Sequence, residues 1–350
     1  MTAGSEARRR LDVGSIGQLG KRAFVTVGPF PIMLVILFIV FGALSDEHRF
    51  WNGDNIFNIA RQCTYLMIVT MGQMLYLLSR NYDLSTGSCV ALTSIVTSLV
   101  MTWSGWGGNT AAAIAVGCLA GIGVGVGVGF VNGLVVSVFN VTSFMVTLGM
   151  SFMAFGAALM LSSGLPVTGL PSAFVSGLGT GRVYEPVDGF ALSYVFSSVP
   201  VVITVGLLIA FYVLLNWTRL GRHAYAIGGN ANAARLSGIA IGRNTIYLFV
   251  LGSVLSAIAG IMLTARISSG EANIGSEFPL LSIAAAVLGG VSLFGGEGRL
   301  LGVVIGVVFI IVLQNGMQLL RLSSYLQLIV LGALLIVALI VDRLRARMQN

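Results

Sequence analysis

Ten long apolar segments, which together contain very few charged residues, constrain the fold of this 350-residue chain more than any other feature. Hydrophobic residues make up 56% of the sequence and charged residues only 9%, whereas soluble domains carry about 25% charged residues. So few charged side chains cannot cover a globular surface in water, and the chain must instead face lipid. We therefore predict an all-α, polytopic membrane protein with about ten transmembrane helices.

The lengths of the segments matter because a helix needs about 20 apolar residues to span a bilayer. They cover residues 28–44, 56–78, 88–103, 111–138, 141–162, 199–216, 243–264, 278–294, 300–319 and 324–341. The segments at 88–103 and 278–294 are the doubtful spans, and we predict broken or tilted helices there. Arg61 lies inside the second segment, and we expect its guanidinium to reach the outer membrane interface.

One membrane domain accounts for almost the whole chain. Residues 1–27 are polar and are predicted to form a cytoplasmic tail, as are residues 343–350. The apolar run at 28–44 is longer than the core of a signal peptide and leads into charged residues, so we predict a retained helix. Residues 28–342 then form the transmembrane domain, and we expect no second soluble domain.

The basic residues predict the side of the membrane on which each loop lies, because cytoplasmic loops are enriched in Lys and Arg. With ten spans and a cytoplasmic N-terminus, 14 of the 19 Lys and Arg residues lie inside, four lie outside, and Arg61 lies within a span. We therefore predict that both termini are cytoplasmic. The long loop at 163–198 is placed outside, and the loop at 217–242 is placed inside.

The cytoplasmic loop contains the signature of a short helix. Asn230 is a favourable N-cap residue, and the stretch that follows it, up to Leu236, is rich in alanine. A capping residue before good helix formers predicts a brief helix. Glycines on both sides, at Gly228 and Gly238, permit sharp turns into and out of this helix.

Several groups that enzymes need are missing from the sequence. The single lysine, Lys21, is not part of a phosphate-binding loop, which requires Lys followed by Ser or Thr after a run containing glycines. The two histidines, His48 and His223, fall on opposite sides of the predicted membrane. We therefore expect no ATP hydrolysis, no metal site and no cofactor in this chain.

Neither the cysteines nor the net charge of +7 points to a further function. Cys63, Cys89 and Cys118 lie in or beside apolar segments, at spacings that match neither a disulfide framework nor a zinc pattern. The basic residues form no basic face interleaved with aromatic side chains, so nucleic-acid binding is not expected. Membrane topology explains the positive charge.

Five glycines recur every four residues within the 111–138 region and predict a helix-packing face. They are Gly117, Gly121, Gly125, Gly129 and Gly133. A four-residue step keeps them on one side of a helix, and each overlapping GxxxG pair lets another helix approach closely. A dinucleotide-binding loop would need G-x-G-x-x-G after a strand, and the third glycine is missing in every register.

Asp83 is the acidic residue of greatest interest near a predicted membrane face. It is followed by Ser85 and Gly87, directly before the short segment at 88–103. Asp before small hydroxyl residues is a common helix N-cap. Interrupted helices also line transport pathways. Both interpretations of Asp83 are compatible with the sequence.

Three motifs resemble permease subunits of bacterial ABC importers for ribose, xylose and similar sugars. They are Asp83-Leu84-Ser85-Thr86-Gly87-Ser88, then Tyr225-Ala226-Ile227-Gly228-Gly229-Asn230 with its continuation to Ile239, and finally Gly289 to Gly298 followed by Gln314-Asn315-Gly316. Their order and spacing hold over residues 60–342. The motif at 225–239 is the most specific of the three.

The resemblance implies a ten-span permease, similar to type II importers, in the bacterial inner membrane. It also implies a dimer of permease subunits, predicted to be a homodimer, with two ATPase subunits that bind ATP and Mg²⁺ and an extracytoplasmic sugar-binding protein. The cytoplasmic loop would contain the coupling helix that contacts the ATPase, with the residues Gly228, Gly229, Asn230, Ala233, Ala234, Arg235, Leu236, Ser237 and Gly238. Tyr82, Asp83, Ser85 and Asn315 are then candidates for the translocation pathway.

Three other functions compete with this prediction. Permeases for branched-chain amino acids or nucleosides share the architecture, and the motif at 225–239 argues against them. An ion-coupled secondary transporter would need a buried ionisable pair, for which the sequence offers no clear candidate. An intramembrane enzyme would need Cys/His, metal-binding or paired acidic groups, which the sequence lacks. The sugar importer permease is the leading prediction.

Overall fold

Helices make up the regular structure of this protein. The computed structural model describes residues 30–185 and 191–349, so the predicted tail at 1–27 lies outside the described residues. Within the described ranges there are no strands, only two isolated β-bridges, which join Val167 to Gly270 and Arg182 to Ser198. The prediction of an all-α polytopic protein is confirmed.

Each of the ten predicted apolar segments corresponds to one helix in the described part of the chain. These helices are α2 (Phe30–Leu44), α3 (Gly53–Leu78), α4 (Thr86–Met101), α5 (Thr110–Phe139), α6 (Ser143–Ser162), α9 (Val199–Trp217), α12 (Ile241–Ile267), α13 (Phe278–Leu288), α14 (Leu300–Leu319) and α15 (Ser324–Gln349). Shorter elements connect them: η1 (Asp46–Trp51), η2 (Ser104–Trp106), α7 (Ser172–Phe174), η3 (Val175–Gly179), α8 (Ala191–Ser197), α10 (Arg219–Gly229) and α11 (Ala231–Leu236). Residues 343–349, predicted as a tail, continue α15.

Three of these helices are shorter than a span within the described residues, and two of them, α4 and α13, were expected from their segments. α2 has 15 residues, α4 has 16 and α13 has 11, against the about 20 that a bilayer requires. α13 ends at Leu288 because Gly289 and Gly290 follow it, and Gly290 has a left-handed backbone with φ +83°. The second half of the predicted 278–294 segment is therefore a loop. Five of the described helices are long and apolar enough to cross a membrane.

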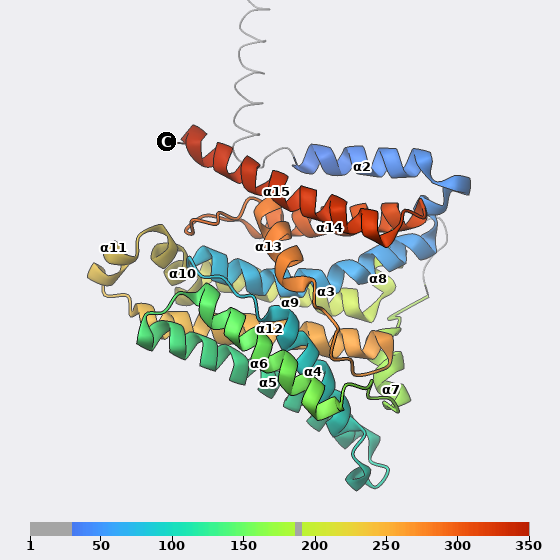
Figure 1. The fold of residues 1–350 in the computed structure, drawn as a ribbon. Coiled ribbons are helices and arrows are strands. Elements are labelled where there is room, and N and C mark those ends of the chain that lie inside the picture. Colours follow the sequence, from blue (N-terminus) through green and yellow to red (C-terminus); the bar gives the residue numbers. More distant parts are fainter. Residues whose placement is uncertain (1–29, 186–190, 350) are drawn as a thin grey trace, which may run out of the picture.

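α3 and α12 lie at the centre of the bundle, and the other long helices surround them (Figure 1). Every side chain of α3 from Thr64 to Leu78 is buried. α12 packs against α3, α4 and α5, and α4 also contacts α6. The peripheral helices carry large exposed apolar side chains, such as Phe152 on α6 at 70% exposure. Such an exposed apolar surface is consistent with a membrane protein.

The glycine ladder of α5 faces its neighbouring helices. Its first two members lie against α4 and its last three against α12. A Cβ at Gly129 would lie only 2.5 Å from the Phe249 carbonyl oxygen, so the two backbones are in direct contact there. By contrast, a Cβ at Gly123 or Gly127 would meet nothing within 4 Å. These two glycines therefore make no close helix contact within the described chain.

The connecting segments gather at two opposite ends of the bundle (Figure 1). One end, the α11 end, carries α10 and α11, the link between α3 and α4, and the loop at 289–299. The other, the α7 end, carries α7, η3 and the loop at 268–277, which a β-bridge joins to Val167. Segments that the charge pattern placed on one side of the membrane thus meet at one end of the molecule.

Candidate functional site

α10 is a helix at the α11 end that the sequence analysis did not predict. Thr218 caps it, because its side-chain oxygen accepts a hydrogen bond from the Gly221 N–H at 3.3 Å. The buried residues of α10 are Gly221, Ala224, Ile227 and Gly228. Their spacing of three to four residues places them on one face of a helix. This amphipathic period is the sequence signal that could have revealed α10.

The predicted short helix is present as α11, and it starts directly after Asn230 rather than at Gly228. The Asn230 Oδ1 accepts a hydrogen bond from the Ala233 N–H at 3.0 Å, as an N-cap residue does. Gly238 has φ +81° and allows the turn that follows. Gly228 is an interior residue of α10 and does not form a turn.

The residues predicted for coupling divide between two faces of α11. Leu236 is 90% exposed, and Ala233, Arg235 and Ser237 are exposed with it. Ala234 is buried, at 4% exposure, and therefore faces the permease itself. α11 thus presents one large apolar side chain and one guanidinium to its surroundings.

Gly228 brings α10 into direct contact with the end of α3. A Cβ at Gly228 would overlap the Leu78 carbonyl oxygen and would lie 2.5 Å from the Gly296 nitrogen. The same Leu78 carbonyl accepts a hydrogen bond from the Gly296 N–H at 3.0 Å. Gly295 and Gly296 have φ values of +83° and +76°, which let their loop follow α10 closely. Backbone therefore contacts backbone where three segments meet.

Arg80 links the same three segments through its side chain. It follows α3, and its backbone is left-handed at φ +59°. Its Nε donates a hydrogen bond to the Phe294 carbonyl oxygen, and its Nη2 donates to the Gly229 carbonyl oxygen at 3.3 Å. The partners lie 214 and 149 residues further along the chain. No local motif marks Arg80, so its sequence context indicates only a basic loop residue.

Two tyrosines complete this assembly. The Tyr82 hydroxyl donates to the Leu293 carbonyl oxygen at 2.7 Å, and the Tyr225 hydroxyl donates to the Gly298 carbonyl oxygen at 2.9 Å. Burial raises the pKa of the Tyr225 hydroxyl above its usual value, although the charge of Arg299 opposes the rise. The Tyr225 hydroxyl therefore remains a donor at neutral pH. The term loop junction here means Leu78, Arg80, Tyr82, Tyr225, Gly228, Gly229 and the loop at 289–299.

Asp83 and Ser85 lie beside the loop junction and are completely buried. The Asp83 Oδ1 accepts hydrogen bonds from the Ser85 backbone N–H at 2.7 Å and from the Ser85 hydroxyl at 2.6 Å. The side-chain amide of Asn132 donates to the Ser85 Oγ at 2.9 Å. Asp83 thus orders the start of α4, and both side chains are held within the bundle in this conformation.

Asn315 lies at the other end of the bundle, where it pairs with Asn55. The Asn55 Nδ2 donates to the Asn315 Oδ1 at 3.1 Å, and the Asn315 Nδ2 donates back to the Asn55 Oδ1 at 2.8 Å. Asn55 is at the start of α3 and Asp83 follows its end. A helix of 26 residues spans about 39 Å at 1.5 Å per residue. The structure therefore separates Asn315 from Tyr82, Asp83 and Ser85.

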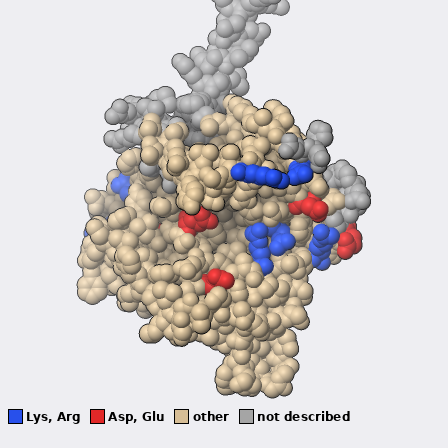
Figure 2. All heavy atoms as spheres, turned by 45° about the vertical axis from the view of Figure 1, so that its right-hand side comes forward, with Lys and Arg blue, Asp and Glu red and all other residues tan. Residues whose placement is uncertain are grey.

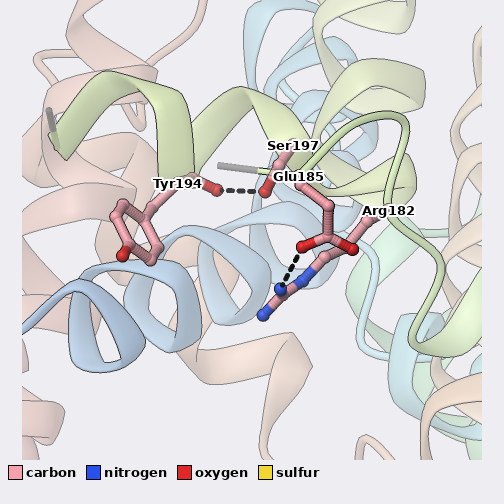
Figure 3. A network of polar contacts seen from close by, with 4 residues as sticks. All are labelled: Arg182, Glu185, Tyr194 and Ser197. Atoms are coloured by element: carbon pink, nitrogen blue, oxygen red, sulfur yellow. Dashed lines mark hydrogen bonds and ion pairs between the residues drawn. The ribbon is translucent and has the colours of Figure 1, made fainter. Parts of the chain in front are cut away.

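The α7 end carries charged side chains on an otherwise largely uncharged surface, as Figure 2 shows. Arg182 and Glu185 form an ion pair at 3.4 Å, with the Glu185 side chain 90% exposed (Figure 3). Nearby, the Ser197 hydroxyl donates to the Tyr194 carbonyl oxygen at 2.9 Å. Among the residues that the structure describes, no group of three or more His, Cys, Asp or Glu side chains forms a potential metal site.

Arg61 lies at the α7 end of α3, where it was expected to reach the membrane interface. Its side chain is half-buried, and its guanidinium carbon lies 5.3 Å from the centre of the Phe57 ring. The guanidinium of Arg182 approaches the same ring at 5.1 Å. Both contacts are cation–π contacts, which stabilise a guanidinium that is only partly solvated.

The sequence of the bundle matches a known family of transport proteins. The family model for the permease component of the branched-chain amino acid transport system matches residues 55–339. That range runs from α3 into α15 and includes every residue of the loop junction. The chain therefore belongs to this family. It is a permease subunit of an ABC importer, a transport subunit rather than an enzyme, and it resides in the inner membrane.

Individual relatives agree with the family over most of the chain. The D-allose transport system permease protein AlsC of Escherichia coli (strain K12) is 34% identical over 89% of this chain and 90% of that protein. The ribose import permease protein RbsC of Bacillus subtilis (strain 168) is 36% identical over 91% and 92%. The L-arabinose transport system permease protein AraH of Escherichia coli (strain K12) is 36% identical over 81% and 80%. No solved structure matches the chain.

Proposed function

We propose that this chain is the permease subunit of an ATP-driven importer for a monosaccharide that an extracytoplasmic binding protein delivers. The observation that carries the proposal is similarity over nearly the whole chain to permeases for ribose, D-allose and L-arabinose, at 34–36% identity. These three substrates are all monosaccharides. The relatives thus support one substrate class, while the particular sugar differs among them.

We infer that the α11 end faces the cytoplasm and that the α7 end faces outward. The charge pattern of the sequence supports this orientation, because a cytoplasmic N-terminus assigns 14 of the 19 Lys and Arg residues to the side of the 217–242 loop, which contains α11. Both termini are then cytoplasmic. Two copies of this chain form the membrane part of the importer, and lipid covers the exposed apolar side chains. ATP and Mg²⁺ bind to the partner ATPase, since this sequence has no phosphate-binding loop.

The ATPase docks on α11 in this proposal, and the loop junction passes its movement to the helices. Leu236 and Arg235 are the two largest exposed side chains that α11 offers to the ATPase. α11 follows α10 directly, and Gly228 of α10 contacts the end of α3. A displacement of α11 therefore reaches both α3 and the loop at 289–299 through main-chain contacts.

The test of the proposed function is sugar uptake by proteoliposomes that contain the permease and its ATPase. Binding protein is supplied outside, ATP inside, and the panel contains D-ribose, D-allose and L-arabinose. L-leucine is included because the family description names branched-chain amino acids. We expect ATP-dependent uptake of a monosaccharide. Uptake of leucine alone, or uptake by the permease without the ATPase under a proton or sodium gradient, would contradict the proposal.

A second experiment tests the role of α11. Arg235→Glu reverses the charge of the guanidinium offered to the ATPase, and Leu236→Ala removes the exposed apolar side chain. Loss of a hydrogen bond to a charged group weakens docking about ten- to a hundredfold. The measurement is co-purification of the ATPase, with Arg219→Glu on α10 as the matched charge control. Ala234 is not a target in this experiment because it is buried against the permease.

A further inference from the structure

A small pocket at the α7 end lies between α3, α12, α13 and α14, and it is not explained by the loop junction. Its volume is about 250 Å³. Its polar and aromatic lining consists of Gln62, Tyr65, Arg266, Glu277, Phe278 and Gln314. Sites for drug-sized ligands measure about 300–1,000 Å³. The pocket therefore suits a smaller ligand, of the size of one sugar ring.

Tyr65 provides a polar group that points to a ligand. Its side chain is 2% exposed, and it lines the pocket. The Tyr65 hydroxyl oxygen is buried and has no hydrogen-bond partner among the described residues. A buried hydroxyl without a partner reduces stability, so such groups are normally satisfied by protein, water or ligand. A ligand hydroxyl in the pocket would supply the missing partner.

The groups around Tyr65 can both donate and accept hydrogen bonds. The guanidinium carbon of Arg266 lies 5.3 Å from the centre of the Tyr65 ring, and its Nη2 donates to the Asn58 Oδ1 at 3.3 Å. A guanidinium has five N–H donors, so further donors remain. Gln62 and Gln314 each contribute an amide, which has donors on one atom and an acceptor on the other.

This combination of groups matches a neutral polyhydroxylated ligand. Sugar hydroxyls donate and accept at the same time, as do the amides and the phenol. Arg266 and Glu277 carry opposite charges and leave the lining without net charge. The Arg61 guanidinium lies near Tyr65 but does not line the pocket. The apolar side of a sugar ring can lie against Phe278 and the buried side chains of Leu66 and Leu281. An apolar amino-acid side chain would leave the polar groups unpaired.

We propose that this pocket binds one monosaccharide within a single permease subunit, at the outward end, after the sugar leaves the binding protein. The inference rests on the proposed function. Beyond the pocket, the side chains of α3 are buried as far as Leu78. A sugar in the pocket is therefore held at the outward end until the helices move. In this proposal, Gln314 of the third sequence motif binds the sugar.

The first test is protection of a cysteine in the complete transporter. Ile274→Cys places a thiol in the lining without removing a polar group, in a Cys63→Ser background because Cys63 follows Gln62 directly. A charged thiol reagent is applied with and without D-ribose, D-allose or L-arabinose. A sugar that binds the pocket should slow the reaction about tenfold when its concentration is ten times Kd.

Arg321→Cys is the matched control for this test. Arg321 is exposed, lies at the same end of the bundle and does not line the pocket. Its rate of modification should not change with any sugar. The pocket proposal is overturned if the transporter takes up a sugar and that sugar leaves the Ile274→Cys rate unchanged. Failure of the proposed function is different, because then the wild-type transporter takes up none of the three sugars.

The second test concerns the Tyr65 hydroxyl. Tyr65→Phe keeps the ring and removes the hydroxyl, so we expect about three- to tenfold fewer sugar molecules imported per ATP hydrolysed. Gln314→Leu should also change the ratio of uptake rates between a pentose and a hexose, which a purely structural role would not do. Tyr325→Phe is the control, since Tyr325 is 81% exposed. Wild-type sugar-to-ATP ratios for Tyr65→Phe would exclude its hydroxyl from the site.

Discussion

The two ends of the bundle share close main-chain contacts but differ in the side chains that surround them. At the α11 end, Gly228 contacts the Leu78 carbonyl, and the Arg80 side chain donates to two further carbonyl oxygens. At the α7 end, a β-bridge joins Val167 to Gly270, and exposed charged side chains are added, as in the ion pair of Arg182 and Glu185. Close backbone contacts permit one geometry, whereas exposed charged side chains adopt many rotamers and are screened by salt.

The two ends of the chain therefore respond differently to movement. Movement of α10 must displace α3 or the loop at 289–299, because no side chain lies between Gly228 and the Leu78 carbonyl. The charged side chains at the α7 end, by contrast, can change rotamer without moving a helix. We therefore expect substitutions in the loop junction to affect stability and coupling more than substitutions of the exposed charged side chains at the α7 end.

Gly228→Ala should have the largest effect. The added Cβ would overlap the Leu78 carbonyl oxygen, and neither helix can move aside without opening the loop junction. Overpacking costs about 1–3 kcal/mol, and we expect the upper part of that range. The melting temperature of the purified permease and its ATP-driven uptake should both fall.

Gly229→Ala is the matched control for Gly228→Ala. It makes the same chemical change in the neighbouring residue of α10, but its Cβ would meet nothing within 4 Å. Both variants gain the same intrinsic helix propensity. Equal melting temperatures for the two variants would mean that close backbone contact does not hold the loop junction, and the contrast between the two ends would fail.

Asn315→Leu should have the next largest effect on stability. It removes the partner of Asn55, which then keeps only the bond from its Nδ2 to the Phe50 carbonyl oxygen at 2.9 Å. A buried polar group that loses its partner costs about 1–3 kcal/mol, and we expect the lower part of that range because Asn55 is only half-buried. The double variant with Asn55→Leu should be less destabilised than the two single losses added together. Strict additivity in melting experiments would exclude a coupled amide pair.

Arg80→Ala should have a smaller effect on stability and a clear effect on coupling. It removes two hydrogen bonds to carbonyl oxygens, and an exposed side chain of this kind contributes on the order of 1 kcal/mol. We expect ATP hydrolysis to continue while fewer sugar molecules are imported per ATP. Arg80→Lys keeps the charge but lacks the guanidinium fork. If both variants retain the wild-type ratio, Arg80 does not transmit movement.

Glu185→Gln should have the smallest effect. It removes the exposed ion pair with Arg182 and leaves the Arg182 guanidinium over the Phe57 ring. Exposed ion pairs contribute about 0.2–1 kcal/mol, and salt weakens them. Stability and uptake should match the wild type at 0.5 M salt or above. At that salt concentration the Debye length is only about 4 Å, so the ion pair is already largely screened. A large loss there would show that the α7 end is as rigid as the α11 end.

Much of the fold could be predicted because it depends on local signals. Long runs of apolar residues define the helices, since each must satisfy its own backbone hydrogen bonds in lipid. α11 is local as well, because Asn230 caps it through a residue only three positions away. α10 was missed because Gly221, Ala224 and Gly228 occupy most of its buried face. Small side chains at a spacing of three to four residues form an amphipathic period, but this period is easily overlooked beside the long apolar runs of the spans.

Only the tertiary structure decided which of these residues meet. Arg80 contacts Gly229, 149 residues along the chain, and Tyr65, Arg266 and Gln314 line one pocket from three different helices. A capping bond or an apolar run involves neighbouring residues and can be read from a short stretch of sequence. The choice of which helix faces touch depends on how all of the helices pack together, and no single segment contains that information.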